Sequence, residues 1–281
     1  ASAGNKVTIT VTPGRNATVQ RITVTDEDGE RLKLTENRDG TYSFTVYLVN
    51  DGCTDGTAEA VEENFPQTRI IRGSGTLYWN LGMHAAWEEA AKDAPDFYLW
   101  TNVRARMKEG ALACLMETSM FLRHKAIVVG TAEDSSGELS YGGRNKSGKI
   151  VEPDPAIPVP CYTFDGKLVL VPSHVYRILG NLDIHYQHSY GDIDYGVRAF
   201  KANVVRVVAP GVLCTCDRSE HVQKWRDRSC SLHDRIAYLY APDGRPPHQQ
   251  FIYDCRSQGF VYAVVHGISV AIKVFFPKKM K

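Results

Sequence analysis

The sequence lacks any run of about twenty apolar residues, the length that a helix needs to cross a bilayer, so no membrane-spanning helix is expected. It shows no leader of the secretory kind, and its first residues look like those of a truncated or processed chain. Internal repeats and low-complexity tracts are also missing. The 281 residues, 43% hydrophobic and 23% charged, suit one large globular domain or two small ones.

Excess charge and paired cysteines are lacking as well. The formal net charge is +1, which gives no general attraction to polyanions, so we expect no nucleic-acid partner. The seven cysteines include no Cys-x-x-Cys pair, and Cys214 and Cys216 have no second pair nearby to complete a zinc site. Scattered reduced thiols are favoured over a disulfide framework, which predicts a cytoplasmic protein.

Residues 1–45 have the pattern of short β-strands. Alternating runs begin near Lys6, Arg21, Arg31 and Tyr42, and Asp-Gly turns separate them, which is a strong hairpin signal. The segment resembles the small β-sandwich repeats of bacterial surface proteins. Because so few residues cannot form an independent sandwich, we expect these strands to add to the main domain or to pair with each other against it.

A strand, an acidic turn and a helix follow in residues 46–65. Val46 to Val49 form an apolar run, the turn carries Asp51 and Asp55, and helical spacing begins at Ala58. This is the βα unit of an open α/β sheet, in which ligands bind at the carboxyl ends of the strands. Carboxylates at that place suit hydroxyl and amide groups of a sugar or a base better than phosphates.

Strands and helices alternate after this unit, which predicts an α/β fold. Strands are expected at 69–72, 96–100, 126–130, 168–171 and 204–208; helices at 80–91, 109–123, 174–179 and 192–202; a proline-rich loop at 152–160; and a mostly helical tail from residue 216.

Several motifs, in order, resemble bacterial family-2 inverting glycosyltransferases that use nucleotide sugars, of the rhamnosyltransferase-like subfamily. Residues 46–57 resemble that family's V-D-D-G-S-T-D-G-T signature, with Asn50 and Cys53 as departures. Similar motifs stand at residues 73–83, 141–145, 164–172, 180–198, 225–235 and 241–247. The resemblance implies a Rossmann-like, A-type glycosyltransferase fold with an atypical β-rich N-terminus. We expect three segments: a β-rich segment 1–45, a glycosyltransferase domain 46–259, and an apolar, then basic, tail 260–281.

The resemblance also implies a site for the donor nucleotide. Its residues would be Asp51, Asp55, Gly75, Trp79, Asn80, Asn102 and Arg104. The family carries a pair of Asp at the end of one strand to hold Mg²⁺ or Mn²⁺ on the donor diphosphate, whereas this chain has Val103 and Arg104 there. No metal or other cofactor is therefore predicted. Two alternatives remain: Arg104 and Arg106 bind the diphosphate directly, or the site is inactive and the arginines are solvated.

Two carboxylates, Asp192 and Asp194, lie at the start of the helix predicted at 192–202, where the helix dipole stabilises negative charge. By its place in the motif, Asp192 is the expected catalytic base, which would deprotonate the acceptor hydroxyl. Both carboxylates serving only as helix caps is the alternative. The residues expected on the acceptor side are Tyr141, Asp165, His188 and Asp194.

The resemblance implies transfer of a sugar from a nucleoside-diphosphate donor to a saccharide or lipid-linked acceptor, in the synthesis of bacterial surface polysaccharide. A catalytically inactive homologue that binds a glycan or a partner is the alternative, and a surface β module fused to a transferase remnant is a third. The apolar, then basic, end of the chain suits either a contact with the inner membrane from the cytoplasmic side or a core helix with a solvated tail.

Overall fold

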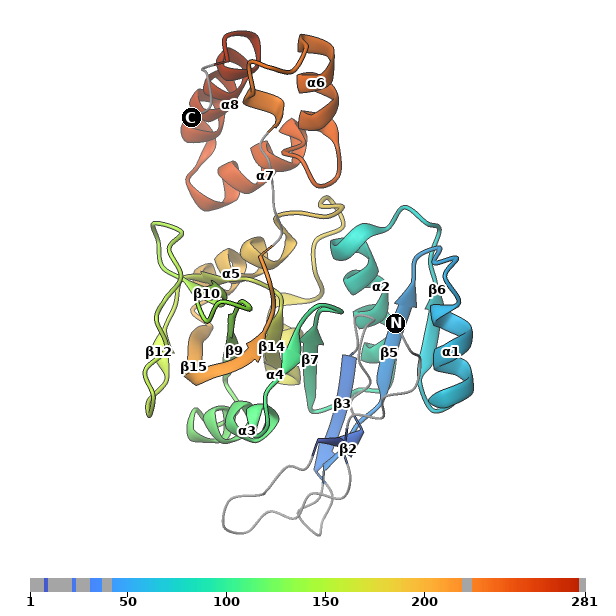
Figure 1. The fold of residues 1–281 in the computed structure, drawn as a ribbon. Coiled ribbons are helices and arrows are strands. Elements are labelled where there is room, and N and C mark those ends of the chain that lie inside the picture. Colours follow the sequence, from blue (N-terminus) through green and yellow to red (C-terminus); the bar gives the residue numbers. More distant parts are fainter. Residues whose placement is uncertain (1–7, 10–21, 24–30, 37–41, 219–223, 278–281) are drawn as a thin grey trace.

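The computed structural model describes residues 8–9, 22–23, 31–36, 42–218 and 224–277, with side chains described from residue 43 onward. One large sheet lies below a group of C-terminal helices (Figure 1). The main path of the sheet runs β12 (Val159–Pro160), β15 (Val205–Thr215), β9 (Ala126–Glu133), β14 (Leu168–Pro172), β7 (Phe97–Thr101), β3 (Arg31–Glu36), β5 (Val46–Asn50) and β6 (Arg69–Arg72). Short strands pair onto it: β10 (Leu139–Tyr141) on β9, β4 (Tyr42–Ser43) on β3 and β8 (Arg106–Met107) on β15. The α/β class predicted from the sequence is confirmed.

The directions of the strands decide where ligands can meet. β5 and β6 are parallel, as are β9 and β15. β14 runs antiparallel to both β7 and β9, and β3 runs antiparallel to both β5 and β7. The carboxyl ends of β5, β6, β7, β9 and β15 therefore share one edge of the sheet with the amino-terminal ends of β3 and β14.

The N-terminal segment contributes to this sheet. In β3, Arg31 is paired with Tyr47 of β5 on one side and with Trp100 of β7 on the other. The expectation that these strands add to the main domain is thus confirmed for β3 and β4, while β1 (Thr8–Ile9) and β2 (Ile22–Thr23) form a separate antiparallel pair. The Asp-Gly turns expected near residues 26–29 and 37–41 lie outside the described residues. The domain boundary at residue 45 stays a prediction.

Helices cover both faces of the sheet, which explains why the central strands read as continuous apolar runs. On one face, α3 (Ala111–Phe121) packs Leu112 and Leu115 against Leu99. On the other face, α2 (Tyr78–Lys92), α4 (Ser173–Leu179) and α5 (Gly191–Lys201) bury Trp87 against Trp100. α1 (Thr57–Asn64) connects β5 to β6.

Three sequence expectations need adjustment. The helix expected from residue 109 begins at Ala111, because Gly110 takes a positive φ of 77° that ends the preceding turn. The loop at 152–160 ends in β12, which pairs with Val207 and Val208 of β15. β15 continues to Thr215, beyond the expected end at Val208, because it also pairs with β9 and β8 there. β11 (Gly143–Arg144) and β13 (Thr163–Phe164) form a small pair beside the sheet.

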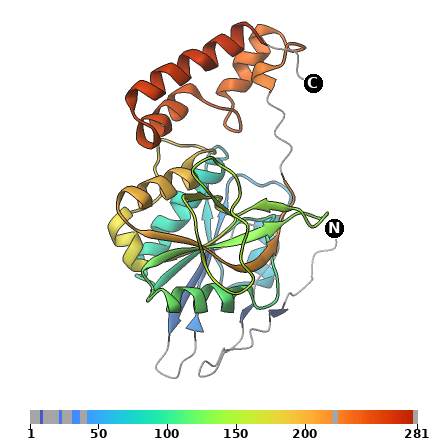
Figure 2. The same ribbon diagram turned by 90° about the vertical axis from the view of Figure 1, so that its left-hand side faces the viewer.

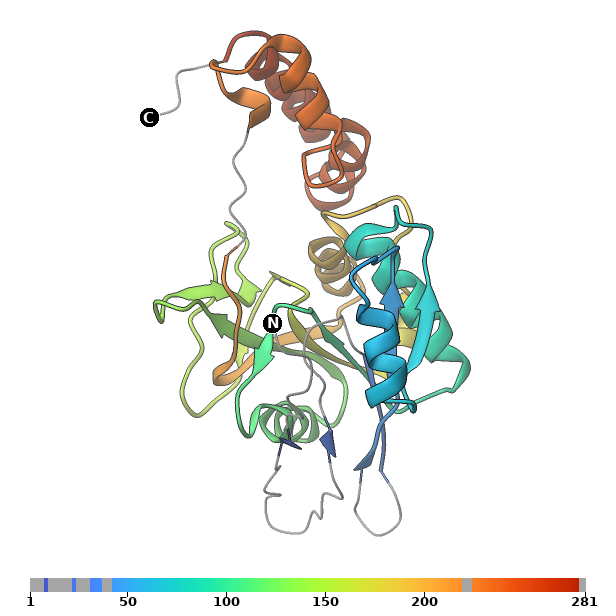
Figure 3. The same ribbon diagram turned by 45° about the vertical axis from the view of Figure 1, so that its right-hand side comes forward.

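The chain ends in a helical group that Figure 2 and Figure 3 place above the sheet. It consists of the 3-10 helix η1 (Lys224–Arg226), α6 (Leu232–Tyr240), α7 (Pro247–Ser257) and α8 (Phe260–Phe275). Trp225, Leu239, Val270 and Val274 form its own apolar core. α8 therefore packs with its neighbours as a helix, while residues 278–281 of the predicted tail lie outside the described part.

Candidate active site

The edge of the sheet defined by strand direction gathers most of the predicted site residues. Asp51 follows β5, the loop at 73–77 follows β6, and Asn102 to Arg104 follow β7. The turn at 165–167 precedes β14, which runs the opposite way, so this turn reaches the same edge. The sheet thus brings residues from the predicted donor and acceptor sides together.

Asp51 shapes the donor side by holding the next loop. Its Oδ1 accepts a hydrogen bond from the backbone N–H of Gly75 at 2.7 Å, and its Oδ2 accepts from Leu77 at 2.7 Å and Tyr78 at 3.0 Å. Gly52 and Gly75 both have positive φ, and a Cβ on Gly52 would lie 3.0 Å from the Cα of Gly75. The turn after β5 and the loop after β6 therefore pack closely, because Gly52 has no side chain and Asp51 accepts hydrogen bonds from the second loop. Glycine at such positions also lets a ligand come close to the backbone.

Trp79, Gly166 and Asp192 meet at the centre of this edge. A Cβ on Gly166 would lie 2.5 Å from the Cη2 atom of Trp79 and 3.3 Å from the Cβ of Asp192. The Trp79 N–H faces Nδ1 of His188 at 3.4 Å, and the His188 ring lies edge-on to Tyr78. The structure thus places a predicted donor residue, Trp79, beside the predicted base.

Asp192 is a partly buried carboxylate in a tight setting. Its Oδ2 accepts a hydrogen bond from the Gly166 N–H at 2.8 Å. Burial raises the pKa of Asp192, and the negative charge of Asp165 adds to the rise, while the Gly166 and Ile193 N–H groups and the Lys167 charge oppose it. A carboxylate with a raised pKa is a stronger base, which is what proton abstraction from a hydroxyl requires.

Two other predicted acceptor residues, Asp165 and Tyr141, contact basic side chains near Asp192. Asp165 accepts two hydrogen bonds from Nε of Arg144, at 2.9 and 3.0 Å, and one from the N–H of Gly142. The Tyr141 ring lies 4.8 Å from Nζ of Lys167. Arg144 and Lys167 were not predicted as site residues. Both are basic and lie inside motifs at 141–145 and 164–172, which could have identified them as candidate site residues.

Val103 and Arg104 follow β7, at the positions where the sequence resemblance led us to look for a pair of Asp. Val103 is exposed, and the carbonyl-like Oδ1 of Asn102 accepts the N–H of Arg104. Arg104 and Lys167 both lie close enough to Cys216 for their charges to oppose the rise that burial causes in the pKa of its thiol. Two cations therefore belong to this edge of the sheet, Arg104 after β7 and Lys167 before β14.

The residues present do not fit a divalent cation. Hard cations need several oxygen ligands, and across the described part of the chain no group of three or more His, Cys, Asp or Glu is arranged to hold a metal ion. The side chains at 103 and 104 supply a methyl pair and a guanidinium.

Three predicted site residues make contacts inside the protein. Asn80 is fully buried, and its Nδ2 donates to the carbonyls of Asp183 and Tyr186. Asp194 is also fully buried, and Asp55 is exposed at the start of α1, where it accepts the N–H of Thr57 at 3.1 Å. These contacts stabilise helix starts and loops, and a ligand-binding role for these residues stays a prediction.

Asp194 belongs to an ionic network that anchors α7 to α5. Its carboxylate accepts hydrogen bonds from Arg198 at 3.1 Å, Arg256 at 2.6 Å and the Tyr186 hydroxyl at 3.0 Å. Arg256 also bonds Asp183 at 2.9 Å. Burial works to raise the pKa of Asp183, but hydrogen bonds from His185 and Arg256 outweigh it and lower the pKa to about 2. The network fixes the C-terminal helices beside the candidate site.

A scan against protein-family models found no match, and no curated protein matches the chain. Among solved structures, the chain is similar to GalNAc-T7 with UDP, GalNAc and Mn²⁺ (13% identity, TM-score 0.46, 83% of this chain and 52% of that one). It is also similar to S. aureus TarS 1-349 in complex with UDP-GlcNAc (12% identity, TM-score 0.47, 80% and 71%). A third is the mannosyltransferase PcManGT from Pyrobaculum calidifontis with GDP-Man and Mn²⁺ (15% identity, TM-score 0.43, 87% and 68%). The present chain thus spans about half the length of the first.

Proposed function

We propose that the chain is an inverting, A-type glycosyltransferase that moves a sugar from a nucleoside diphosphate to a saccharide or lipid-linked acceptor, in the synthesis of bacterial surface polysaccharide. One observation carries the proposal: Asp192, with its raised pKa, adjoins Trp79 and Gly166 at the edge of the sheet where the Asp51 loop and two cations converge. The order of the sequence motifs supports the same reading.

The chemistry assigned to Asp192 is that of a general base. Its carboxylate takes the proton of the acceptor hydroxyl while the hydroxyl oxygen bonds to the anomeric carbon of the donor. The bond from that carbon to the diphosphate breaks on the opposite side, and the nucleoside diphosphate leaves with the electron pair. Inversion follows because attack and departure occur on opposite faces of the sugar.

The leaving diphosphate needs positive charge, and this chain offers it through side chains. Arg104 and Lys167 would bind the phosphate oxygens by charge-assisted hydrogen bonds, with Arg able to bind two oxygens at once. Donor binding would then be independent of divalent metal.

Replacing both Arg104 and Lys167 by Ala is expected to weaken binding of a nucleoside diphosphate, each change by about 1.5–3 kcal/mol, because a charge-assisted contact is lost. Calorimetric titration of UDP, GDP and dTDP measures this, with and without EDTA. Lys149→Ala, in an exposed turn, is the control. Full affinity in the double variant, or affinity that depends on manganese, would contradict the prediction.

An inactive, nucleotide- or glycan-binding homologue is the second candidate, favoured by the absence of the carboxylate pair at Val103 and Arg104. The two functions separate in a turnover assay in metal-free buffer with a panel of nucleotide sugars. Sugar transfer or donor hydrolysis supports the enzyme, and saturable nucleotide binding without turnover supports the homologue. Changing both residues to Asp would add metal-dependent turnover only in the second case.

Asp51→Ala is expected to weaken nucleotide binding by about 1–3 kcal/mol, because three backbone N–H groups lose their common acceptor and the 75–78 loop loosens. Calorimetry with the best nucleotide measures the change. Asp134→Ala is a matched control, since Asp134 also accepts backbone N–H groups in an exposed turn. Unchanged affinity would remove the Asp51 loop from the donor site.

A peripheral membrane contact through α8 belongs to the same proposal. Within the described residues, no helix is both long and apolar enough to pass through a bilayer. α8 instead exposes an apolar stripe at Val261, Val265, Ile268, Ile272 and Phe275. From residue 255 to the end, the sequence holds one Arg, four Lys and no acidic residue. An apolar face with basic neighbours suits the surface of an anionic membrane.

Glu at both Ile268 and Ile272 is expected to lower vesicle binding at least about ten-fold, because charge replaces apolar contact on the stripe. Sedimentation with phosphatidylglycerol vesicles at low salt measures this. The control is Lys92→Ser, at the exposed C-terminal end of α2. Equal binding by the Glu variant would place any membrane contact elsewhere.

A further inference from the structure

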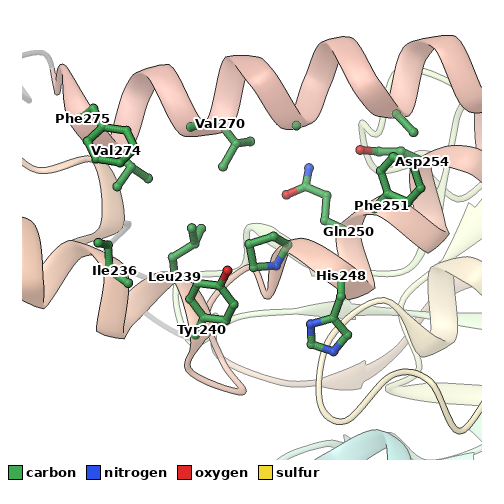
Figure 4. A pocket seen from close by; sticks show the side chains of 14 residues that line it. Ile236, Leu239, Tyr240, His248, Gln250, Phe251, Asp254, Val270, Val274 and Phe275 are labelled. Atoms are coloured by element: carbon green, nitrogen blue, oxygen red, sulfur yellow. The ribbon is translucent and has the colours of Figure 1, made fainter.

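The C-terminal helices line a cavity, partly open to solvent, that the proposed transfer reaction does not use. Its volume is about 550 Å³. It lies between α6, α7 and α8, and Figure 4 shows the side chains that line it. Its walls are mostly apolar and include Leu239, Tyr240, Phe251, Val270 and Val274. Its volume falls within the range of about 300–1,000 Å³ that is common for small-molecule sites.

Small residues on α8 keep the cavity open. Ala263, Gly267 and Ala271 line it at intervals of four residues, which places them on one face of the helix. A Cβ built on Gly267 meets nothing within 4 Å. Larger side chains at these positions would fill the space, so the sequence leaves room along the length of the helix.

One end of the cavity is polar and buried. Gln250 is 6% exposed and Asp254 is 4% exposed, and both contribute to the lining. Asp254 accepts a hydrogen bond from Nδ1 of His266 at 2.8 Å, and Nε2 of Gln250 lies 3.1 Å from the same atom. Oε1 of Gln250 has no hydrogen-bond partner within the described residues. In Figure 4 the Gln250 amide points into the space between α7 and α8.

The groups at this end define the ligand that fits. A buried oxygen without a donor is costly, and the neighbouring carboxylate also accepts hydrogen bonds, so a ligand should supply a donor. An anionic head group would meet Asp254 unfavourably. The middle of a helix from a second copy offers no free backbone donor, because its N–H groups are already paired.

We propose that α6, α7 and α8 form a binding site for a long-chain alcohol. Its hydrocarbon chain lies along Ala263, Gly267 and Ala271, and its hydroxyl donates to Oε1 of Gln250 after a small rotation of the amide. The site stands apart from the transfer reaction, and its occupancy is measurable without any nucleotide sugar.

The test is calorimetric titration of the full chain with 1-decanol, decyl methyl ether and decanoate, each below its aggregation limit. We expect saturable binding of one decanol, and binding at least ten-fold weaker for the ether, which has no donor, and for the anion. Binding of decanoate as tight as that of decanol would overturn the assignment of the polar end, and partition without saturation would overturn the site.

Variants that fill the cavity keep the proposal falsifiable. Gly267→Leu and Ala271→Leu are each expected to weaken decanol binding at least ten-fold without lowering the melting temperature, because both add a good helix former. Val264→Leu adds bulk at an exposed position of α8 outside the cavity and should bind as the parent does. Gln250→Met should bring decanol and the ether to equal affinity. Unchanged binding in both filling variants would overturn the proposal.

Discussion

Asp192→Asn is expected to lower sugar transfer by about 100-fold or more while leaving nucleotide affinity unchanged, because the amide keeps the shape of the side chain and cannot accept the proton. An Asn oxygen accepts either the Gly166 N–H or the Ile193 N–H, which the two carboxylate oxygens accept in the parent protein, so the calorimetric affinity also reports whether the local fold is kept. The comparison of turnover with calorimetric affinity separates a missing base from a damaged donor site. Equal turnover in the variant would remove Asp192 from the mechanism.

The pH dependence gives a second measurement on the same variant. The raised pKa of Asp192 predicts that transfer by the parent protein falls with decreasing pH earlier than an ordinary aspartate would cause. Because its pKa is raised in the folded state, Asp192 costs no folding free energy at a pH below its unfolded pKa, where it is protonated in both states. As the pH rises through the folded pKa, its ionisation lowers the free energy of unfolding. At neutral pH, Asp192→Asn should therefore melt at a higher temperature than the parent, and the difference should vanish in acid.

Arg256→Met is expected to cost about 3–5 kcal/mol of unfolding free energy, because it leaves the buried Asp194 and the partly buried Asp183 without their shared partner. Urea denaturation at neutral pH measures the loss. Arg69→Met is the control, since Arg69 is half exposed where it pairs with Asp93 and also donates to the Tyr47 hydroxyl, so its loss should cost less than that of Arg256. Arg256→Lys should recover part of the loss.

The acid limb of stability tests the same network. Asp183 has a lowered pKa, so its contribution is present above the unfolded pKa of about 4 and is lost as the pH falls toward about 2. In Arg256→Met that pH-dependent loss should shrink. Equal costs for Arg256→Met and Arg69→Met would show that the network contributes no more than a surface pair.

The local pattern of the sequence sufficed to predict most of the helices and strands of the sheet domain, whereas the role of Asp192 stays a prediction. The strand, turn and helix around Asp51 were readable because period-two and helical spacing change within a few residues. Asn80 was predicted at the donor site from its place after Trp79, yet its amide holds a loop more than one hundred residues away in sequence, at Asp183. Such a contact has no local signature.

The cations at the site were harder to predict for a related reason. Lys167 reaches the same edge of the sheet as Arg104 because β14 runs antiparallel next to β7, and strand order is not encoded in the spacing of apolar residues. Arg256 belongs to a helix far along the chain, and its partners Asp183 and Asp194 are set by packing between α7 and α5. The sequence shows which residues are charged, but it does not show which charged residues far apart in the chain pair with each other.

The position of β3 has a consequence for how the chain is built and handled. In the described sheet, β3 lies between β5 and β7 and pairs with both. It therefore joins the pair β5 and β6 to the remaining strands. β3 is synthesised before β5 and β7, so it pairs on both sides only after both of these strands have been made. The pairing of β3 with β7 joins residues far apart in the sequence, and such contacts slow folding. A fragment cut at residue 46 would leave the edges of β5 and β7 that face β3 without their partner, and unpaired strand edges are surfaces on which chains assemble with one another.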